Sequence, residues 1–180
     1  YNLAIGLASP LLLLWLGSRK LAGRIPGLAE RLGFIGEPRP KGTAPVAWLH
    51  AVSLGETKLA TFLADQLRSR VPGLRVVMTS STRTGWEEAR RSAAPGDIVL
   101  FPPVDYAWIC RRFLRKLQPD VVVVLETEFW PNLFRETKRA GAGLLLVNGR
   151  ISDRSIARYR ATRLFWRRVL AYPDVFYVQS

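Results

Sequence analysis

The stretch VAWLHAVSLGETKLATFLADQLRSR, residues 46–70, joins an apolar run to an amphipathic one. Its first part, 46–52, is short and almost continuously apolar, as in a strand that is buried on both faces. Its second part, 56–70, repeats apolar residues at helical spacing. Between them, Ser53 and Gly55 precede a carboxylate, Glu56, at the point where the helix should begin. This strand, turn and helix predict one unit of an α/β fold.

The same alternation recurs along the rest of the chain. Short apolar runs, each expected to be a strand, follow at 74–79, 97–101, 120–126, 143–148 and 175–178. Helical patterns separate them at 85–93, 106–117, 130–141 and 154–172. Apolar strands that are each followed by a helix are typical of a parallel sheet covered on both faces. The sequence therefore predicts a doubly wound α/β domain over residues 46–180.

Composition favours a compact domain with an anionic partner. The chain has 180 residues, is 48% hydrophobic, and carries 27 Lys and Arg against 14 Asp and Glu, a formal net charge of +13. Such a charge favours nucleic acid, acidic lipid or a phosphorylated substrate, without choosing among them. A single cysteine, Cys110, excludes a disulfide framework and a multi-cysteine zinc site, and we expect it to be a small buried hydrophobe.

The N-terminal segment, 1–35, has a different character from the body. Its residues 3–16 are uncharged and apolar, and basic residues follow directly. The run is shorter than the ~20 residues that span a bilayer comfortably, and Pro10 interrupts it. We expect a membrane-associating helix, an anchor or an interfacial helix, with its basic flank on the cytoplasmic side; a buried core helix is the alternative. Residues 36–45, GEPRPKGTAP, read as a linker to the body.

The candidate site follows from the predicted architecture. Open parallel sheets bind ligands beyond the carboxyl ends of their strands, so the residues after each apolar run are the candidates. They are Ser53, Gly55 and Glu56 after the first strand; Ser81, Thr82, Arg83, Thr84 and Gly85 after the second; Asp105 after the third; Glu126 and Glu128 after the fourth; and Asn148 and Arg150 after the fifth.

Several of these residues have structural interpretations that remain open. Glu56 is either a carboxylate that favours the positive end of a helix or a catalytic group. The Ser and Thr of residues 80–85 fit ordinary helix capping, and His50 fits a hydrogen-bonded core histidine. Glu126 and Glu128 are harder to explain structurally, because carboxylates beside a buried strand are unfavourable unless paired or functional. Neither a dinucleotide fingerprint nor a P-loop motif is present, and no metal-ligand cluster is apparent.

Five strings occur together in a recognisable order: HAVSLGET, TSSTRTG, ETEFWPNL, NGRISDRS and a terminal QS. In this order and approximate spacing the chain resembles the 3-deoxy-D-manno-octulosonic acid (Kdo) transferases of lipopolysaccharide biosynthesis, from its apolar N-terminus to its end. The departures are small. FPPVD stands where the family more often has Tyr before the Asp, and NGR stands where it often has NAR.

The resemblance implies a membrane-associated, inverting glycosyltransferase of the GT-B type, built from two Rossmann-like domains. It implies that this chain is the N-terminal, acceptor-binding half, and that the donor CMP-Kdo is held mainly by a C-terminal domain absent here. The fragment alone should therefore be inactive. No cofactor or metal is implied. The acceptor is a lipid A precursor, and the expected location is the cytoplasmic side of the inner membrane.

The resemblance also assigns roles to residues. Glu56 matches the family's general base, and Glu126 matches a position that stabilises the transition state. The remaining candidates are expected to bind the acceptor or line the site.

Two non-catalytic functions remain as alternatives. A nucleic-acid-binding α/β domain would explain the charge, but no RNA or DNA motif is recognisable, so no nucleic acid partner is expected. A basic membrane-interaction domain would explain the arginines of 150–168 but not the carboxylates at the strand ends.

Overall fold

The computed structural model describes residues 25–36, 44–126, 128–150 and 159–179. Within them, six strands form one parallel sheet in the order β3-β2-β1-β4-β5-β6. The strands are β1 (Val46–Ala51), β2 (Arg75–Ser80), β3 (Ile98–Leu100), β4 (Val121–Leu125), β5 (Gly143–Gly149) and β6 (Val175–Val178). The chain winds outward from β1 to β3 and then returns to place β4 on the other side of β1. This order, the one found in dinucleotide-binding folds, confirms the predicted doubly wound, Rossmann-like sheet.

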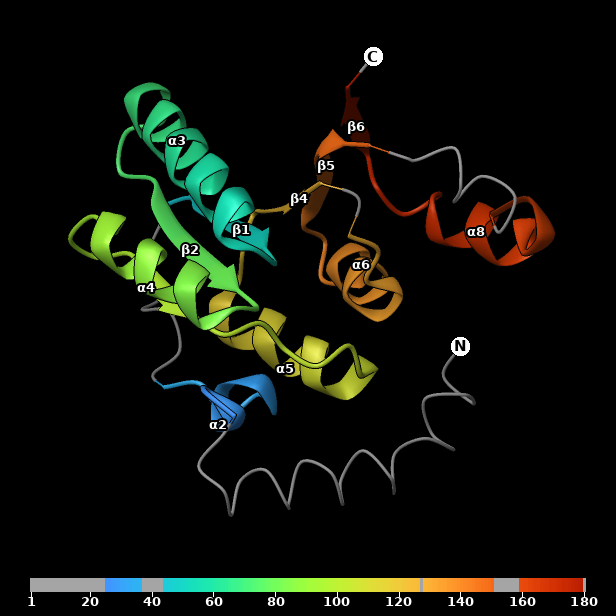
Figure 1. The fold of residues 1–180 in the computed structure, drawn as a ribbon, viewed down its shortest axis with the longest axis horizontal. Coiled ribbons are helices and arrows are strands. Elements are labelled where there is room, and N and C mark those ends of the chain that lie inside the picture. Colours follow the sequence, from blue (N-terminus) through green and yellow to red (C-terminus); the bar gives the residue numbers. More distant parts are fainter. Residues whose placement is uncertain (1–24, 37–43, 127, 151–158, 180) are drawn as a thin grey trace.

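Helices cover both faces of the sheet (Figure 1). One face packs against α3 (Leu54–Arg70) and α4 (Arg83–Ser92), and the other against α5 (Ala107–Leu117) and α6 (Pro131–Arg139). The short α2 (Leu28–Arg31) lies near α5, and α8 (Arg163–Val169) lies at the side of the molecule beyond α6. Successive residues of β1 supply the two cores in turn: Trp48 faces α5, and Leu49 faces α3.

Strand β1 is buried along its whole length, and this explains its apolar sequence. The one polar side chain in it, His50, is fully buried and lies 2.9 Å from the Thr79 hydroxyl through its Nδ1 atom. The same hydroxyl accepts a hydrogen bond of 2.9 Å from the Trp48 indole N–H, so it links two side chains of β1. Burial lowers the pKa of His50 to about 3. The prediction of a hydrogen-bonded structural histidine is therefore confirmed.

Residues 25–36, which the sequence assigned to the N-terminal segment, pack against the body of the domain. The Arg31 guanidinium donates a 2.6 Å hydrogen bond to the carbonyl oxygen of Ser81, and its Cζ lies 4.9 Å from the ring centre of Phe101. The Glu30 carboxylate accepts the backbone N–H of Phe101 at 2.7 Å, and Ile35 is buried in the core beside α5. The short helix α2 is thereby fixed at the carboxyl edge of β2 and β3.

Two sequence predictions for the ends of the chain meet the structure only in part. The expected apolar membrane helix and the middle of the linker fall in 1–24 and 37–43, outside the described residues. Within the described ranges, no helix combines the length and apolar character that crossing a membrane requires. The helix expected over 154–172 is interrupted at Thr162, whose backbone is not helical, and α8 begins after it.

Gly85 allows the N-terminal ends of α3 and α4 to approach each other. It is buried, and a Cβ atom there would collide with the Ser80 hydroxyl. The same Cβ atom would lie 2.8 Å from Thr57 Oγ1 and 3.0 Å from Thr82 Oγ1. Gly55, at the start of α3, has no such neighbours: the nearest atom to its Cβ position is Ser53 Oγ, at 3.9 Å.

We expect Gly85→Ala to lower the free energy of unfolding by about 1–3 kcal/mol, because the added methyl group overpacks a filled site. Gly55→Ala is the matched control, and we expect no loss of stability because Ala favours the helix and meets open space. Urea unfolding followed by tryptophan fluorescence measures both. Equal stabilities of the two variants would contradict the close helix contact.

Candidate active site

The carboxyl ends of β1 and β4 meet at the point where the strand order reverses. The two strands pair in parallel, with His50 opposite Val124, so that both end at the same edge. Glu56 lies in the first turn of α3, just after β1, and Glu126 and Glu128 follow β4. The carboxylates of Glu56 and Glu126 both act electrostatically on Glu128. Three glutamates predicted from two separate motifs are therefore gathered at one edge of the sheet.

Glu56 takes part in a reciprocal helix cap. The Ser53 hydroxyl oxygen accepts the backbone N–H of Glu56 at 3.2 Å, and Glu56 Oε2 accepts the backbone N–H of Val52 at 2.8 Å. This is close to a capping box, in which the two side chains satisfy free N–H groups at the helix start. Glu56 is only 5% exposed. The capping interpretation is confirmed, while the catalytic role stays a prediction. Within the described residues, Oε1 of Glu56 accepts no hydrogen bond, so one carboxylate oxygen is left for other chemistry.

Glu126 has an unusual backbone conformation. Its φ angle is +58°, in the left-handed region that non-glycine residues rarely occupy. Its N–H donates a 2.8 Å hydrogen bond to the carbonyl oxygen of Val147, so the turn leaves β4 in register with β5. The side chain is exposed. Backbone conformations of this kind are retained where the surroundings enforce them, and they gather at functional sites.

Glu128 is half-buried, and burial is the largest cause that raises its pKa above the ordinary value. The negative charges of Glu56 and Glu126 raise its pKa further. The nearby Trp130 side chain opposes this rise in the pKa of Glu128. Such a carboxyl group retains its proton to a higher pH than an exposed glutamate.

The residues after β2 have mainly structural roles in the described chain. The Thr82 hydroxyl oxygen accepts the backbone N–H of Gly85 at 3.2 Å and caps α4. The Ser81 carbonyl oxygen is held by Arg31, and Arg83 pairs with Glu87 on the next turn at 2.9 Å. The prediction of capping chemistry for this stretch is thus confirmed. Arg83 and Thr84 are exposed in the first turn of α4. Their expected contact with an acceptor stays a prediction.

Asp105 caps a helix from a distance. Its two carboxylate oxygens accept the backbone N–H groups of Asn132, at 3.2 Å, and Leu133, at 2.8 Å, at the start of α6. Helix α6 has no capping side chain of its own at Trp130, so Asp105 supplies one from the loop after β3. The sequence offered Asp105 as a residue lining the site, and the structure gives it this supporting position.

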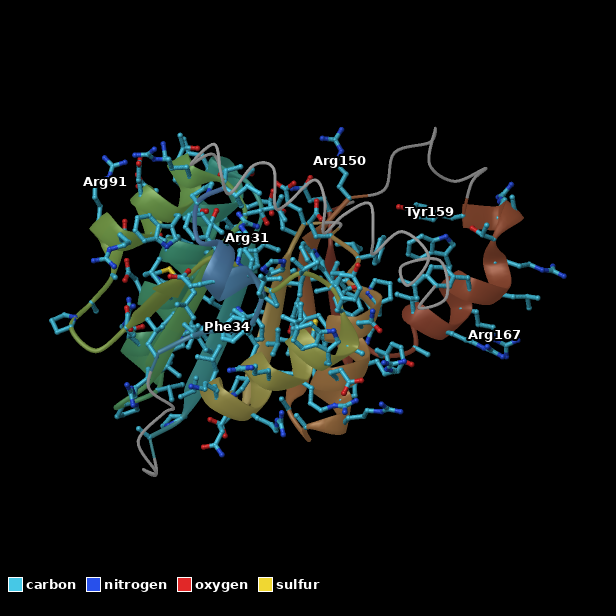
Figure 2. The ribbon with its side chains drawn as sticks, turned by 90° about the horizontal axis from the view of Figure 1, so that it is seen from below. Arg31, Phe34, Arg91, Arg150, Tyr159 and Arg167 are labelled. Carbon is cyan, nitrogen blue, oxygen red and sulfur yellow. The ribbon has the colours of Figure 1, made fainter. Side chains whose placement is uncertain are left out.

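The last residues of β5, together with Arg150 after it, form the far end of the same edge. Asn148 has a φ angle of +62°, and its side-chain oxygen accepts a 2.6 Å hydrogen bond from Gln179. Gly149 is buried, and a Cβ atom there would lie 2.8 Å from Leu146 Cδ2, which gives a packing reason for glycine at this position. Arg150 is exposed and extends away from the sheet (Figure 2).

Sequence reasoning missed two groups that shape the site. Arg31 fixes the loop after β2 from outside the predicted domain, and Trp130 packs edge-on against His50 with ring centres 4.8 Å apart. Trp130 lies within the motif ETEFWPNL, so a large aromatic residue directly after the two glutamates was the signal that could have identified it. Nothing in the sequence indicated that Arg31 would contact the loop after β2. Across the described ranges, no group of three or more His, Cys, Asp or Glu side chains is arranged to hold a metal ion.

The Rossmann-type sheet, with carboxylates at the point where the strand order reverses, places the chain among the α/β domains that bind or transform a ligand at that point. Comparison with known proteins narrows that class. The family described as 3-Deoxy-D-manno-octulosonic-acid transferase (kdotransferase) matches residues 26–180. The chain belongs to this family.

Individual relatives agree with the family match. A 3-deoxy-D-manno-octulosonic acid transferase of Chlamydophila psittaci is 35% identical over 154 residues, which are 85% of this chain and 35% of the relative. One from Bordetella pertussis is 37% identical over 166 residues, 87% of this chain and 38% of the relative. A bifunctional glycosyltransferase/methyltransferase of Fusobacterium nucleatum is 33% identical over 74% of this chain. The chain thus spans little more than a third of the length of the two transferases.

We expect Glu128→Gln to be more stable than the natural chain near neutral pH. Because its pKa is raised, the folded protein holds the Glu128 proton more tightly than the unfolded chain does. Its contribution to stability is complete below the ordinary value of 4.5 and is lost as the pH rises through the raised value. The stability advantage of the variant should therefore grow as pH rises, in urea unfolding between about pH 4 and about pH 7.5.

Glu136 is the contrasting control. Burial would raise its pKa, but hydrogen bonds from Arg111 and Arg135 outweigh burial and lower it. Its contribution to stability is present above the ordinary value and is lost as pH falls, so Glu136→Gln should be less stable than the natural chain at neutral pH. A Glu128→Gln variant that weakens steadily relative to the natural chain as pH rises would show that the carboxylates do not repel one another.

Proposed function

We propose that this chain is the acceptor-binding, N-terminal half of an inverting GT-B glycosyltransferase. The reaction is the transfer of Kdo from CMP-Kdo to the glucosamine 6-hydroxyl of a lipid A precursor, in lipopolysaccharide biosynthesis. The observation that carries the proposal is the meeting of Glu56, Glu126 and Glu128 at the reversal point of the sheet, in a member of the Kdo transferase family. Carboxylates suit a transfer in which a hydroxyl loses a proton and a sugar carbon becomes cationic.

Glu56 acts as the general base in this proposal. The acceptor hydroxyl oxygen forms a bond to the anomeric carbon of Kdo, its proton passes to Glu56, and the bond from that carbon to the CMP phosphate oxygen breaks with inversion. The hydrogen bond from the Val52 N–H to Oε2 supports the role, because it holds one carboxylate oxygen in place and leaves Oε1 without a hydrogen bond from the described residues. A carboxylate positioned in this way contributes ~10²- to 10⁴-fold to rate.

Glu126 and Glu128 supply negative charge near the reacting carbon. The Kdo carbon gains positive charge as CMP departs, and nearby carboxylates lower the energy of that state. Glu126 is exposed, so it is accessible to a donor held by a second domain. Glu128 is half-buried, and the charges of both Glu56 and Glu126 act on it. The departing CMP is an anion, and the donor domain must neutralise it. The reaction needs no cofactor on this account.

The basic surface of the α8 region is proposed to meet the phosphates of the acceptor and of the inner membrane, on its cytoplasmic side. Arg160, Arg163, Arg167 and Arg168 are all exposed, and Leu164 among them is 74% exposed. Figure 2 shows Arg167 extending outward from α8. Clustered arginines beside an exposed apolar side chain suit a phosphorylated lipid, since each nearby Lys or Arg contributes about 1 kcal/mol to binding an anionic surface.

The decisive experiment replaces Glu56 by Gln in the complete enzyme. We expect kcat to fall by ~10²-fold or more with little change in the acceptor KM, because Gln cannot accept the proton. The Gln side-chain oxygen can still accept the Val52 N–H, so the helix cap and the unfolding midpoint should be kept. Glu87→Gln, an exposed carboxylate change on α4, is the matched control and should leave turnover unchanged. Substantial turnover by Glu56→Gln would remove Glu56 from the base role.

A second experiment tests the acceptor surface. This chain is titrated in mild detergent with a tetra-acylated lipid A precursor and with its bis-dephosphorylated form. We expect the phosphorylated form to bind more tightly, by about fivefold for each arginine that pairs with a phosphate. An Arg163→Gln, Arg167→Gln double variant should erase that difference between the two lipids. Equal affinity of the natural chain for both lipids would show that phosphate recognition lies elsewhere.

A further inference from the structure

The loop that carries Glu126 and Glu128 is held by aromatic side chains on two sides. The Phe129 ring centre lies 5.0 Å from that of Trp166 and 6.0 Å from that of Tyr159. The next residue, Trp130, packs edge-on against His50 in β1. Consecutive residues of one loop therefore contact different parts of the fold: one contacts the α8 region and the other the centre of the sheet.

The partners of Phe129 form a cluster of their own. The rings of Tyr159 and Trp166 meet edge to face at 4.7 Å, and Phe165 meets Trp166 at 5.1 Å. We call Phe129, Tyr159, Phe165 and Trp166 the α8 aromatic cluster. Phe129, Phe165 and Trp166 are partly buried against the core that also contains α5 and α6, so the cluster is continuous with the domain interior. The Phe129–Trp166 contact is tilted and the other contacts of the cluster are edge to face, and this packing restricts the orientation of each ring.

The loop needs such a restraint for two reasons. Glu126 leaves β4 with a left-handed backbone, which does not persist unless its surroundings enforce it. Glu128 is half-buried beside two other carboxylates, and like charges in a partly desolvated place push apart. Both effects favour movement of the loop away from Glu56. The aromatic contacts of Phe129 and Trp130, the two residues directly after Glu128, oppose that movement.

We propose that Trp166, acting through Phe129, is a positioning residue that holds the Glu126–Glu128 loop beside Glu56. Helix α8 then has two functional sides: its aromatic side fixes the loop, and its arginine side faces solvent. The effect on turnover rests on the proposed glycosyl transfer, whereas the effect on loop order does not.

The test compares three variants in the complete enzyme. Trp166→Leu removes the contact with Phe129, Trp166→Phe keeps an aromatic ring there, and Tyr172→Leu removes a different half-buried aromatic side chain from the same core. Three quantities are measured: hydrogen–deuterium exchange of the peptide covering 126–130, kcat and acceptor KM for Kdo transfer, and the unfolding midpoint. The exchange measurement needs no activity, so it reports on the loop even if the proposed reaction is wrong.

We expect Trp166→Leu to lower kcat by about tenfold or more, with acceptor KM changed much less, because misplaced carboxylates slow the chemical step. Exchange in 126–130 should become faster by a similar factor. Trp166→Phe should restore most of both. Tyr172→Leu should lower the unfolding midpoint as much as Trp166→Leu without changing the loop or kcat.

A double-mutant cycle with Phe129→Leu keeps the test decisive even if one variant is unstable. Because both residues act through one contact, the double variant should be no slower than the slower single variant. Additive losses, or equal effects of Trp166→Leu and Tyr172→Leu on exchange and kcat, would overturn the proposal and leave Trp166 as a packing residue. A freed loop in Trp166→Leu together with full turnover by Glu56→Gln would refute the proposed base and leave the positioning contact standing.

Discussion

The parallel pairing of β1 with β4 is the contact on which the rest of the structure depends. Asp120 fixes its start, since one of its carboxylate oxygens accepts the backbone N–H of Val46 at 2.6 Å and its own N–H donates to the Val46 carbonyl oxygen at 2.9 Å. The helices that follow the two strands, α3 and α6, pack on opposite faces of the sheet, so the carboxyl edge between them is the place where open α/β sheets bind ligands. A slip of one residue would reverse which side chains of β4 enter each core.

That edge holds charges that the rest of the fold must tolerate. Glu56 is compensated by the N–H of Val52 and by the positive end of α3, whereas Glu128 has the charges of two other glutamates beside it. Glu126 adds a left-handed backbone. The crowded Glu128 carboxyl group and the left-handed backbone of Glu126 do not favour stability, unlike the Glu56 helix cap. Their presence together fits the proposed chemistry at this edge, and the aromatic contacts of Phe129 and Trp130 restrain the loop that carries them.

Much of this arrangement was predictable because the underlying signals are local. The apolar runs at 46–52 and 120–126 became β1 and β4, shortened by a residue or two at their ends. The capping interpretation of Ser53, Glu56 and Thr82 also held, since a cap involves residues three or four positions apart. Asp105 was different. Its carboxylate caps α6 across the fold, and no local pattern distinguishes such a cap from a ligand-binding aspartate.

The sequence by itself determined the alternation of strands and helices, the buried character of β1 and His50, and the presence of glutamates directly after two strands. These follow from hydrophobic period and neighbouring residues, which act over a few positions. Only the tertiary structure decided that β4 returns to β1, that Glu56, Glu126 and Glu128 therefore share one edge, and that Trp166 reaches Phe129. The reason is that strand order and side-chain contacts depend on register and on packing between segments far apart in the sequence. These are set by the core as a whole and cannot be deduced from any single segment.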